Sequence, residues 1–478
     1  MADTIQVAVL GAGPGGYAAA FYAADLGMSV ALIDEEKNPG GVCLYRGCIP
    51  SKALLHVAKV VDEAKHAGNW GVSFGEPKID IDKLRAYKQG VVDKLTAGVG
   101  SVAKLRKVQF VQGRATLTGP NSMSVAGGDG KKTELKFEHL ILATGSHPTK
   151  IPSLSLESDR MMDSTSGLDL PDVPKSLLVI GGGYIGLELG TVYATIGSKV
   201  TVVEATPTLL PGADRDLVQV LEKRLKGLFA TILTSTKVVK VAAEGKTGIR
   251  VTFESAGSGG PSGPPTEQVF DRVLVAIGRR PNSKIPGLET TGVKVDAKGF
   301  IETDPQRRTA TKNIFAIGDV AGEPMLAHKA SHEARVAVEA IAGHKAIFEP
   351  QAIPAVVFTD PEIAWCGLTE AEAQAKGVDH DVAKFPWGAS GRAITVDRPD
   401  GLTKLIIEKK TQRILGVGIA GAGAGELIAE GVLAIEMGAT AEDLKLTIHP
   451  HPTLSESVME SAEVFFGQST HVFKPKKK

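Results

Sequence analysis

Short apolar runs alternate with segments of helical periodicity along most of the chain. Residues 6–10 and 30–34 predict buried strands, and the alanine-rich segment between them predicts a helix that extends to about Gly27. The same order returns later, with apolar runs at 177–180 and 199–204 on either side of another helical segment. Because a helix joins two strands in each unit, the pattern predicts an α/β fold built on two parallel sheets.

The remaining pattern completes these units and adds one region. Short alternating runs at 108–137 predict an antiparallel excursion, and a buried strand follows at 139–143. A strand-to-turn signal at 313–319 and a helix at 325–342 are expected to return to the first unit. Beyond residue 350 the pattern predicts an α+β domain. Further expected elements are helices at 60–105 with a break at 68–80, a hairpin loop at 255–265, strands at 273–277, 355–358, 403–408 and 416–420, and helices at 425–437 and 455–466.

A glycine-rich turn follows the first strand of each unit. The turns are Gly11-Ala12-Gly13-Pro14-Gly15-Gly16 and Gly181-Gly182-Gly183-Tyr184-Ile185-Gly186. Glycines at these spacings permit a tight turn, close approach of backbone amides to a pyrophosphate, and close packing of the helix on the sheet. The next strand ends in an acid, Asp34 or Glu204, at the same interval after the middle glycine, where a carboxylate can bind ribose hydroxyls. The sequence therefore predicts two Rossmann-like dinucleotide-binding domains.

Two of the three cysteines, Cys43 and Cys48, lie close enough to bridge, and a helical pattern begins directly after the second. We expect Cys48 near the N-terminus of that helix, where the helix dipole, with Lys52 and Arg46 nearby, lowers the pKa of its thiol. The alternatives are an incidental disulfide and half of a zinc site, but zinc needs further Cys or His ligands at short spacing and none follow. The pair predicts a redox-active disulfide, and no metal site is expected.

Two dinucleotide domains beside one dithiol suggest that electrons pass from thiols through one cofactor to another. A flavin is the natural intermediary, because thiolates reduce it and its reduced form transfers hydride to a nicotinamide. We therefore expect FAD in the first domain and NAD in the second. Glu204 favours NAD over NADP, because a carboxylate repels a 2′-phosphate and the following Ala205-Thr206-Pro207-Thr208 offers no arginine.

The composition of the chain limits which partners and which cellular compartment are expected. The 54 basic and 54 acidic residues balance, which argues against nucleic acid or a membrane surface as the main partner. The apolar run near residues 7–33 is interrupted by glycines, Pro14 and Asp25, so it is not expected to span a membrane. Three cysteines are too few for a disulfide-stapled secreted domain, and the first residues lack the charged start of a signal peptide. A cytoplasmic protein is therefore expected.

Several motifs together resemble the dihydrolipoamide dehydrogenase family of flavoprotein disulfide reductases. They are Gly-Gly-x-Cys-x4-Cys-x-Pro-Ser-Lys at 40–52, the two glycine fingerprints, Ala-Ile-Gly-Asp at 316–319 and His-Pro-His-Pro-Thr-Leu-Ser-Glu at 449–456. That family reoxidises the dihydrolipoyl arms of 2-oxo acid dehydrogenase and glycine-cleavage complexes and passes the electrons to NAD. The resemblance implies lipoamide as small-molecule substrate, the lipoyl domains and acyltransferase core of such complexes as partners, and an obligate homodimer joined through the region after residue 350.

The resemblance also implies roles for matching positions. Cys43 exchanges with substrate sulfur, Cys48 faces the flavin, and His451 of the other subunit is the general base, oriented by Glu456, with His449 the weaker candidate. Lys52 and Glu188 match the charged pair beside the reactive face of the flavin. Expected FAD contacts are Gly11, Gly13, Pro14, Gly15, Gly16, Asp34, Glu35, Gly41, Val42, Lys52, Ala115, Thr144, Gly145, Ser146, Asp319 and Ala327. Expected NAD contacts are Gly181, Gly182, Gly183, Tyr184, Ile185, Gly186, Glu204, Val238, Ala276, Gly278 and Arg279.

The predicted domains follow from these assignments. They are an FAD-binding domain at 1–152, an NAD-binding domain at 153–280, a central segment at 281–350 that completes the FAD site, a dimerisation domain at 351–470 and a basic tail at 471–478.

Some positions depart from the usual family pattern. Tyr45-Arg46 stands where Asn-Val is usual, a change that would shift the dithiol potential or the pKa of Cys48, and Asp34 replaces a glutamate. Tyr184 matches a tyrosine that covers the nicotinamide pocket in related glutathione reductases, so a gating role is a hypothesis. The nearest alternative is a glutathione or mercuric reductase, but the first uses NADP and the second carries a C-terminal cysteine pair that this chain lacks. A mainly structural subunit is the other alternative, against which the intact dithiol and base argue.

Overall fold

The first apolar runs form the centre of a mixed sheet that is covered on both faces. The structure, a computed structural model, describes residues 4–245, 248–257 and 265–473. β1 (Ile5–Leu10) lies between β2 (Val30–Asp34) and β6 (Lys132–Leu142), and β3 (Gln109–Gln112) and β17 (Ile314–Ala316) extend the sheet in parallel. Val7 and Val9 pack into one core cluster and Ala8 and Leu10 into another. Because both faces are buried, the strand is an unbroken apolar run.

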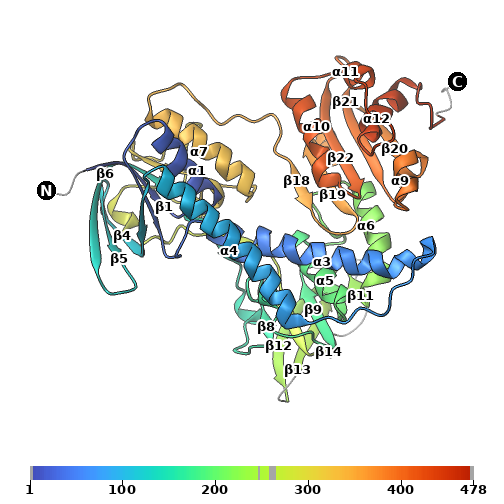
Figure 1. Ribbon diagram of the computed structural model, residues 1–478, viewed down its shortest axis with the longest axis horizontal. Helices are drawn as coiled ribbons and strands as arrows, with labels where there is room; N and C mark the ends of the chain where they lie inside the picture. The colour runs from blue at the N-terminus through green and yellow to red at the C-terminus, as the bar shows by residue number, and fades with distance from the viewer. Residues whose placement is uncertain (1–3, 246–247, 258–264, 474–478) are drawn as a thin grey trace.

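The same sheet carries the predicted excursion and the predicted return. β5 (Ser122–Ala126) pairs antiparallel with both β4 (Arg114–Gly119) and β6, which confirms the predicted excursion from residue 114 onward. The start of the predicted excursion was wrong, because β3 pairs parallel with β2. α7 (Ala327–Ile341) packs beside α1 (Pro14–Asp25), so closely that a Cβ on Gly15 would lie 3.1 Å from the Cβ of Ala330 (Figure 1). The pairing of β17 with β6 confirms that residues 313–319 return to the first unit.

The second unit repeats the first without the return. Its parallel sheet has the order β11-β10-β9-β15-β8, and α5 (Tyr184–Thr195) joins β9 to β10. The strands are β8 (Met161–Met162), β9 (Ser176–Ile180), β10 (Lys199–Val203), β11 (Thr231–Leu233) and β15 (Arg272–Val275), and α6 (Arg215–Leu228) follows β10. A small antiparallel sheet of β12 (Thr236–Glu244), β13 (Gly248–Ser255) and β14 (Thr266–Phe270) is attached. β13 and β14 pair antiparallel, which confirms the hairpin at 255–265, although residues 258–264 lie outside the described residues.

Helices cross between the two units (Figure 1). α2 (Gly41–Arg46) leads into α3 (Cys48–His66), which packs on both α4 (Ile81–Leu105) and α5 and carries Leu54 into the core of the second unit. The break between α3 and α4 falls at 67–80, close to the predicted 68–80. β7 (Ser146–Pro148) of the first unit pairs antiparallel with β16 (Arg279–Pro281), which follows the last strand of the second.

The C-terminal region forms a separate antiparallel sheet backed by helices, shown in orange and red in Figure 1. Its order is β18 (Ala355–Val357), β19 (Glu362–Gly367), β22 (Ile414–Gly421), β21 (Leu402–Glu408) and β20 (His380–Pro386). The helices are α8 (Glu370–Ala375), α9 (Gly391–Thr395), α10 (Ala424–Glu436), α11 (Ala441–Leu446) and α12 (Glu456–Phe466). The predicted α+β class is confirmed. β19 and β20 were not predicted, because charged and half-buried positions interrupt their apolar pattern.

Large apolar side chains remain exposed on one part of this C-terminal domain. Met437 at the end of α10 is 76% exposed, and Leu446 and Ile448 at the end of α11 are 67% and 94% exposed. Exposed apolar residues at the ends of two helices are compatible with the expected interface of a homodimer. Among the described residues, the structure contains no helix with the length and apolar character needed to cross a membrane.

Candidate active site

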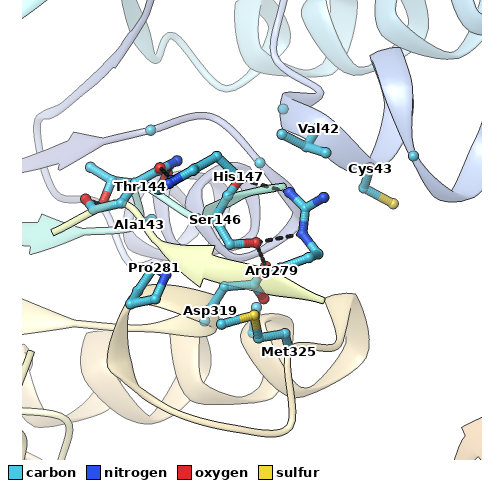
Figure 2. A pocket seen from close by; sticks show the side chains of 18 of the residues that line it. Val42, Cys43, Ala143, Thr144, Ser146, His147, Arg279, Pro281, Asp319 and Met325 are labelled. Atoms are coloured by element: carbon cyan, nitrogen blue, oxygen red, sulfur yellow. Dashed lines mark hydrogen bonds between the residues drawn. The ribbon is translucent and has the colours of Figure 1, made fainter. Parts of the chain in front are cut away.

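A cavity of about 820 Å³ opens at the carboxyl ends of the strands of the first sheet (Figure 2). This edge is where α/β sheets bind nucleotides. Cys43 and Cys48 line the cavity. The predicted FAD contacts that line it are Gly11, Gly13, Pro14, Gly15, Asp34, Glu35, Gly41, Val42, Lys52, Ala115, Thr144, Gly145, Ser146, Asp319 and Ala327.

Each glycine fingerprint occupies positions that exclude a side chain. Gly11 has φ +99°, and a Cβ there would lie 2.3 Å from the carbonyl oxygen of Ala143, while a Cβ on Gly16 would lie 1.8 Å from the carbonyl oxygen of Gly11. The second fingerprint excludes a side chain in the same way, because a Cβ on Gly186 would lie 2.2 Å from the carbonyl oxygen of Gly181. Gly16 therefore acts by close packing of the helix, as the spacing predicts, and not by lining the cavity.

The two acids make equivalent hydrogen bonds. The Ala12 amide donates to Asp34 Oδ2 at 2.6 Å, and the Gly182 amide donates to Glu204 Oε2 at 2.7 Å, with the same separation of 22 residues in the chain. A carboxylate accepts up to about four hydrogen bonds, so each acid retains capacity for ribose hydroxyls. The repeat read from the sequence therefore extends to single hydrogen bonds.

The remaining NAD contacts fall into two groups. Tyr184, Ile185 and Arg279 line the cavity. Tyr184 is 41% exposed, and desolvation of the part within the cavity wall raises the pKa of its phenol. Gly181, Gly182, Gly183, Gly186, Glu204, Ala276 and Gly278 lie at or just beyond the carboxyl ends of β9, β10 and β15. Val238 lies on β12, packed against the core cluster that contains Phe253. An NAD contact of Val238 and a gating role of Tyr184 stay predictions.

Cys48 is the first residue of α3, as predicted, and Cys43 lies within α2. Both are free thiols. A hydrogen bond from the Cys43 thiol, followed by the charge of Lys52, lowers the pKa of Cys48 to about 7 against the opposing effect of burial. The same hydrogen bond, with burial, raises the pKa of Cys43. Arg46 is not among the main causes, contrary to our expectation, because its guanidinium pairs with Glu36.

Lys52 and Glu188 form a pair deep in the cavity wall. Lys52 Nζ lies 2.8 Å from Glu188 Oε2, and Glu188 is 3% exposed, so this is not a surface ion pair. The Ser51 hydroxyl donates to the same carboxylate at 2.9 Å, and the Phe358 amide donates to its other oxygen at 3.0 Å. Lys52 Nζ also lies 4.4 Å from the centre of the Phe358 ring. Four groups from three parts of the chain thus fix one cation beside the dithiol.

A second network joins the two units at the cavity wall (Figure 2). Arg279 Nε donates to Ser146 Oγ at 2.8 Å, and the Ser146 hydroxyl donates to Asp319. A further hydrogen bond fixes the turn that carries Asp319. The Gly318 amide donates to the carboxylate of Glu333, which is fully buried, at 2.6 Å. Sequence reasoning did not identify Ser51, Phe358 or Glu333, because their roles depend on partners far away in the chain.

His451 and Glu456 lie in the C-terminal domain and, within the described part of the chain, are not among the residues that line the cavity. His451 Nδ1 lies 2.9 Å from Glu456 Oε1, and the histidine side chain is 72% exposed. Burial tends to raise the pKa of Glu456, but hydrogen bonds from the Thr453 amide and His451 lower it overall. His449 is buried, with one ring nitrogen 2.7 Å from Glu430 and the other 2.9 Å from the Thr447 carbonyl. It therefore has no ring nitrogen left for a substrate.

The residues around the cavity fit an adenine dinucleotide. The glycine turn directs backbone amides at the N-terminus of α1 toward it, Asp34 lies at the position for a ribose, and the Nε atom of Arg46 is buried without a hydrogen-bond partner among the described residues. These residues would hold FAD. Cys366 lies elsewhere, in the core of the C-terminal domain, where burial raises the pKa of its thiol to about 12.

Comparison with known proteins agrees with this geometry. The pyridine nucleotide-disulphide oxidoreductase profile matches residues 5–334, and the dimerisation domain of that family matches residues 353–462. Dihydrolipoyl dehydrogenase from Vibrio cholerae is 52% identical and that from Haemophilus influenzae 51% identical, each over 97% of this chain and 96% of its own length.

Solved structures show the same likeness over the whole chain. LpdA from Mycobacterium tuberculosis is 26% identical with a TM-score of 0.87, and the flavoprotein disulfide reductase RclA from Escherichia coli is 27% identical with a TM-score of 0.85. Each alignment covers 96% of this chain and 99% of the other. Proteins of this family use FAD and NAD(H). The chain therefore belongs to the pyridine nucleotide-disulphide oxidoreductase family, within its dihydrolipoyl dehydrogenase branch.

Proposed function

We propose that this chain oxidises protein-bound dihydrolipoyl groups to lipoyl groups and reduces NAD⁺ to NADH, as a cytoplasmic homodimer that serves 2-oxo acid dehydrogenase and glycine-cleavage complexes. One observation carries the proposal. The Cys43 and Cys48 thiols line the same cavity as the first glycine fingerprint and the Lys52–Glu188 pair. Relatives named dihydrolipoyl dehydrogenase, 52% and 51% identical, support this choice of substrate.

The sulfur chemistry starts from the oxidised pair. A thiolate of the dihydrolipoyl group attacks Cys43 Sγ, the Cys43–Cys48 bond breaks, and Cys48 leaves as a thiolate. The second substrate thiol attacks the substrate sulfur bonded to Cys43, which closes the lipoyl disulfide and breaks the bond to Cys43. The proton of this thiol passes to the leaving Cys43 sulfur, which becomes a thiol. The substrate loses two electrons and the cysteine pair gains them. The lowered pKa of Cys48 and the raised pKa of Cys43 suit these final states.

The other cavity residues hold charge and orientation. FAD, when bound, supplies the chemistry that carries the electron pair from the dithiol to NAD⁺ as a hydride. Lys52 places a fixed cation beside the dithiol, and Glu188 holds it there. The glycine turn and Asp34 would hold the diphosphate and ribose, while Ser146 keeps Arg279 and Asp319 in fixed positions.

His451 would act as the base that removes protons from the substrate thiols. Donation of Nδ1–H to Glu456 leaves the lone pair of a neutral imidazole on Nε2, and the exposed ring is free to meet a second molecule. Because His451 is not among the described residues that line its own chain's cavity, a second copy has to supply it. The dimerisation-domain match and the exposed apolar residues around α10 and α11 support such a pair of subunits.

The test is a paired assay on the purified protein. We expect flavin absorbance, NADH oxidation with lipoamide, and no turnover with glutathione and NADPH. Turnover with glutathione and NADPH alone would show a different substrate class, and bound flavin without turnover in either assay would show a structural subunit. Protein that is colourless and cannot be reconstituted with flavin would contradict the whole proposal.

A further inference from the structure

Arg46 has a hydrogen-bond donor that the protein itself does not satisfy. It is the last residue of α2, the helix that contains Cys43 and precedes Cys48, and it lines the cavity. One guanidinium nitrogen pairs with Glu36, whereas Nε is buried and has no partner among the described residues. A guanidinium carries five N–H donors, and a buried donor without an acceptor is costly. Because Arg46 also lines the cavity, its unsatisfied Nε is a donor available to an acceptor of a bound ligand.

The contacts of Glu36 place the ion-pair partner of Arg46 beside the acid that ends β2. The Glu36 amide donates to Asp34 Oδ1 at 3.0 Å, and Asp34 Oδ2 accepts from the Ala12 amide of the glycine fingerprint. α2 itself begins against that fingerprint, because a Cβ on Gly41 would lie 2.4 Å from the Cα of Gly13. The Arg46 cation is thus tied to the segment that a dinucleotide diphosphate and its adjoining ribose would contact.

The dithiol is the other candidate for the action of Arg46, and the surroundings of Cys48 argue against it. The charged side chains that act most strongly on Cys48 are Lys52 and Glu188, which hold each other at 2.8 Å. The Arg46 guanidinium is instead engaged by Glu36 on the loop after β2.

We propose that Arg46 retains the FAD cofactor by donating to its diphosphate, and that this contact ties the end of α2, between the redox cysteines, to the cofactor. A bidentate or charge-assisted contact of guanidinium with phosphate is among the stronger single contacts in proteins. The proposal rests on FAD as the bound cofactor and does not depend on the dihydrolipoyl specificity.

The test measures FAD release from the holoenzyme after dilution, by the recovery of free-flavin fluorescence. Arg46→Gln should release FAD about tenfold faster or more, and Arg46→Lys should fall between this variant and wild type. Arg106→Gln is the matched control. Arg106 is also paired with a carboxylate, Asp25 at 2.8 Å, and its side chain is 35% exposed against 39% for Arg46, but it does not line the cavity. Its removal should leave FAD release unchanged.

Glu36→Gln separates a cofactor contact from a merely structural ion pair. This variant breaks the pair but keeps the cation, so FAD release should stay unchanged or slow down. The salt dependence of release should be weaker in Arg46→Gln than in wild type, because one phosphate contact is gone. The proposal is overturned if Arg46→Gln releases FAD within about twofold of wild type, or if Glu36→Gln loses FAD as fast as Arg46→Gln. The rate of FAD release does not depend on whether lipoamide is the substrate. A failed lipoamide assay would therefore contradict the proposed function and leave the proposal for Arg46 untouched.

Discussion

Cys48 holds the negative charge that the proposed exchange leaves on the protein, and three neighbours decide how stable that charge is. The Cys43 thiol donates a hydrogen bond to it and Lys52 lies nearby, while Glu188 acts in the opposite direction. With a pKa of about 7, Cys48 is partly ionised at neutral pH. Such a thiolate is a good leaving group, and its ionisation can be measured directly.

Lys52→Met should raise the pKa of Cys48 above its value of about 7, by about one pH unit, because the variant removes the cation that stabilises the thiolate. The measurement is the pH dependence of alkylation of the reduced enzyme, followed by mass spectrometry. Trypsin cleaves after Arg46 and so separates the Cys43 peptide from the Cys48 peptide. Lys59→Met, on the same helix but paired with Glu63 at 4.0 Å, is the control and should leave the profile in place. An unchanged profile in Lys52→Met would assign the lowered pKa to the Cys43 hydrogen bond alone.

Cys48→Ser should keep bound FAD and lose lipoamide turnover by about a thousandfold or more, because a serine cannot form or release the disulfide. FAD absorbance and the lipoamide assay measure the two properties on one sample. Cys366→Ala is the control, since Cys366 is buried in the core of the C-terminal domain and should affect only stability. Turnover near that of wild type in Cys48→Ser would refute the proposed route.

At the scale of single elements, β6 contains a histidine in an unfavourable position. His139 packs beside Phe315, and its Nδ1 is buried without a partner among the described residues. Burial lowers the pKa of His139, so below its usual value near 6.5 the unfolded chain binds a proton that the folded chain resists. The free energy of unfolding should therefore fall as the pH drops through this range.

His139→Phe should remove this part of the acid destabilisation, because phenylalanine binds no proton in either state. Urea unfolding of the variant and of wild type at pH 5.0 and pH 8.0 measures it, and the gap between the two midpoints should narrow in the variant. His66→Phe, near the exposed end of α3, is the matched control and should leave the gap as in wild type. An equal gap in His139→Phe would place the acid sensitivity elsewhere.

Elements and local motifs could be predicted from the sequence wherever neighbouring residues alone determine the structure. β1 is predicted because both of its faces are buried, and the start of α3 at Cys48 follows from the change to helical periodicity. The pair of Lys52 with Glu188 was predicted only through the family resemblance, and the other contacts of Glu188 could not be predicted, because Ser51 and the Phe358 amide come from positions 137 and 170 residues away. Arg46 and Glu36 are only ten residues apart, but Asp34, Glu35 and Glu36 are all near in sequence, so the choice of Glu36 as the partner of Arg46 appears only in the folded chain.

At the scale of the whole molecule, a cluster of buried charged side chains fixes the C-terminal domain on the second unit. Lys404 of β21 is 1% exposed and lies 2.8 Å from Asp214, 3.0 Å from Asp216 and 2.8 Å from Glu370. Asp214 caps α6 of the second unit, so the cluster joins two domains. Removal of one partner from such a cluster leaves a buried charge uncompensated. The position of His451 is therefore set relative to the nucleotide units, outside the cavity of its own chain.

This arrangement makes a prediction about mixed dimers. In the expected symmetric dimer, each site combines the dithiol of one subunit with His451 of the other. Coexpression of Cys43→Ser with His451→Gln gives hybrid dimers. In each hybrid, one site carries both substitutions and the other site carries neither. Random pairing makes half of the dimers hybrid, so lipoamide activity should recover to about a quarter of wild type, although each variant alone is inactive.

Coexpression of Cys43→Ser with Cys48→Ser is the control, because both changes fall in the dithiol and every site in every dimer then lacks one cysteine. We expect no recovery in that pair. If each chain instead built its site alone, the Cys43→Ser and His451→Gln hybrids would also be inactive, and the shared site would be contradicted. Recovery in the first pair together with none in the second can arise only if His451 reaches the dithiol of the partner subunit.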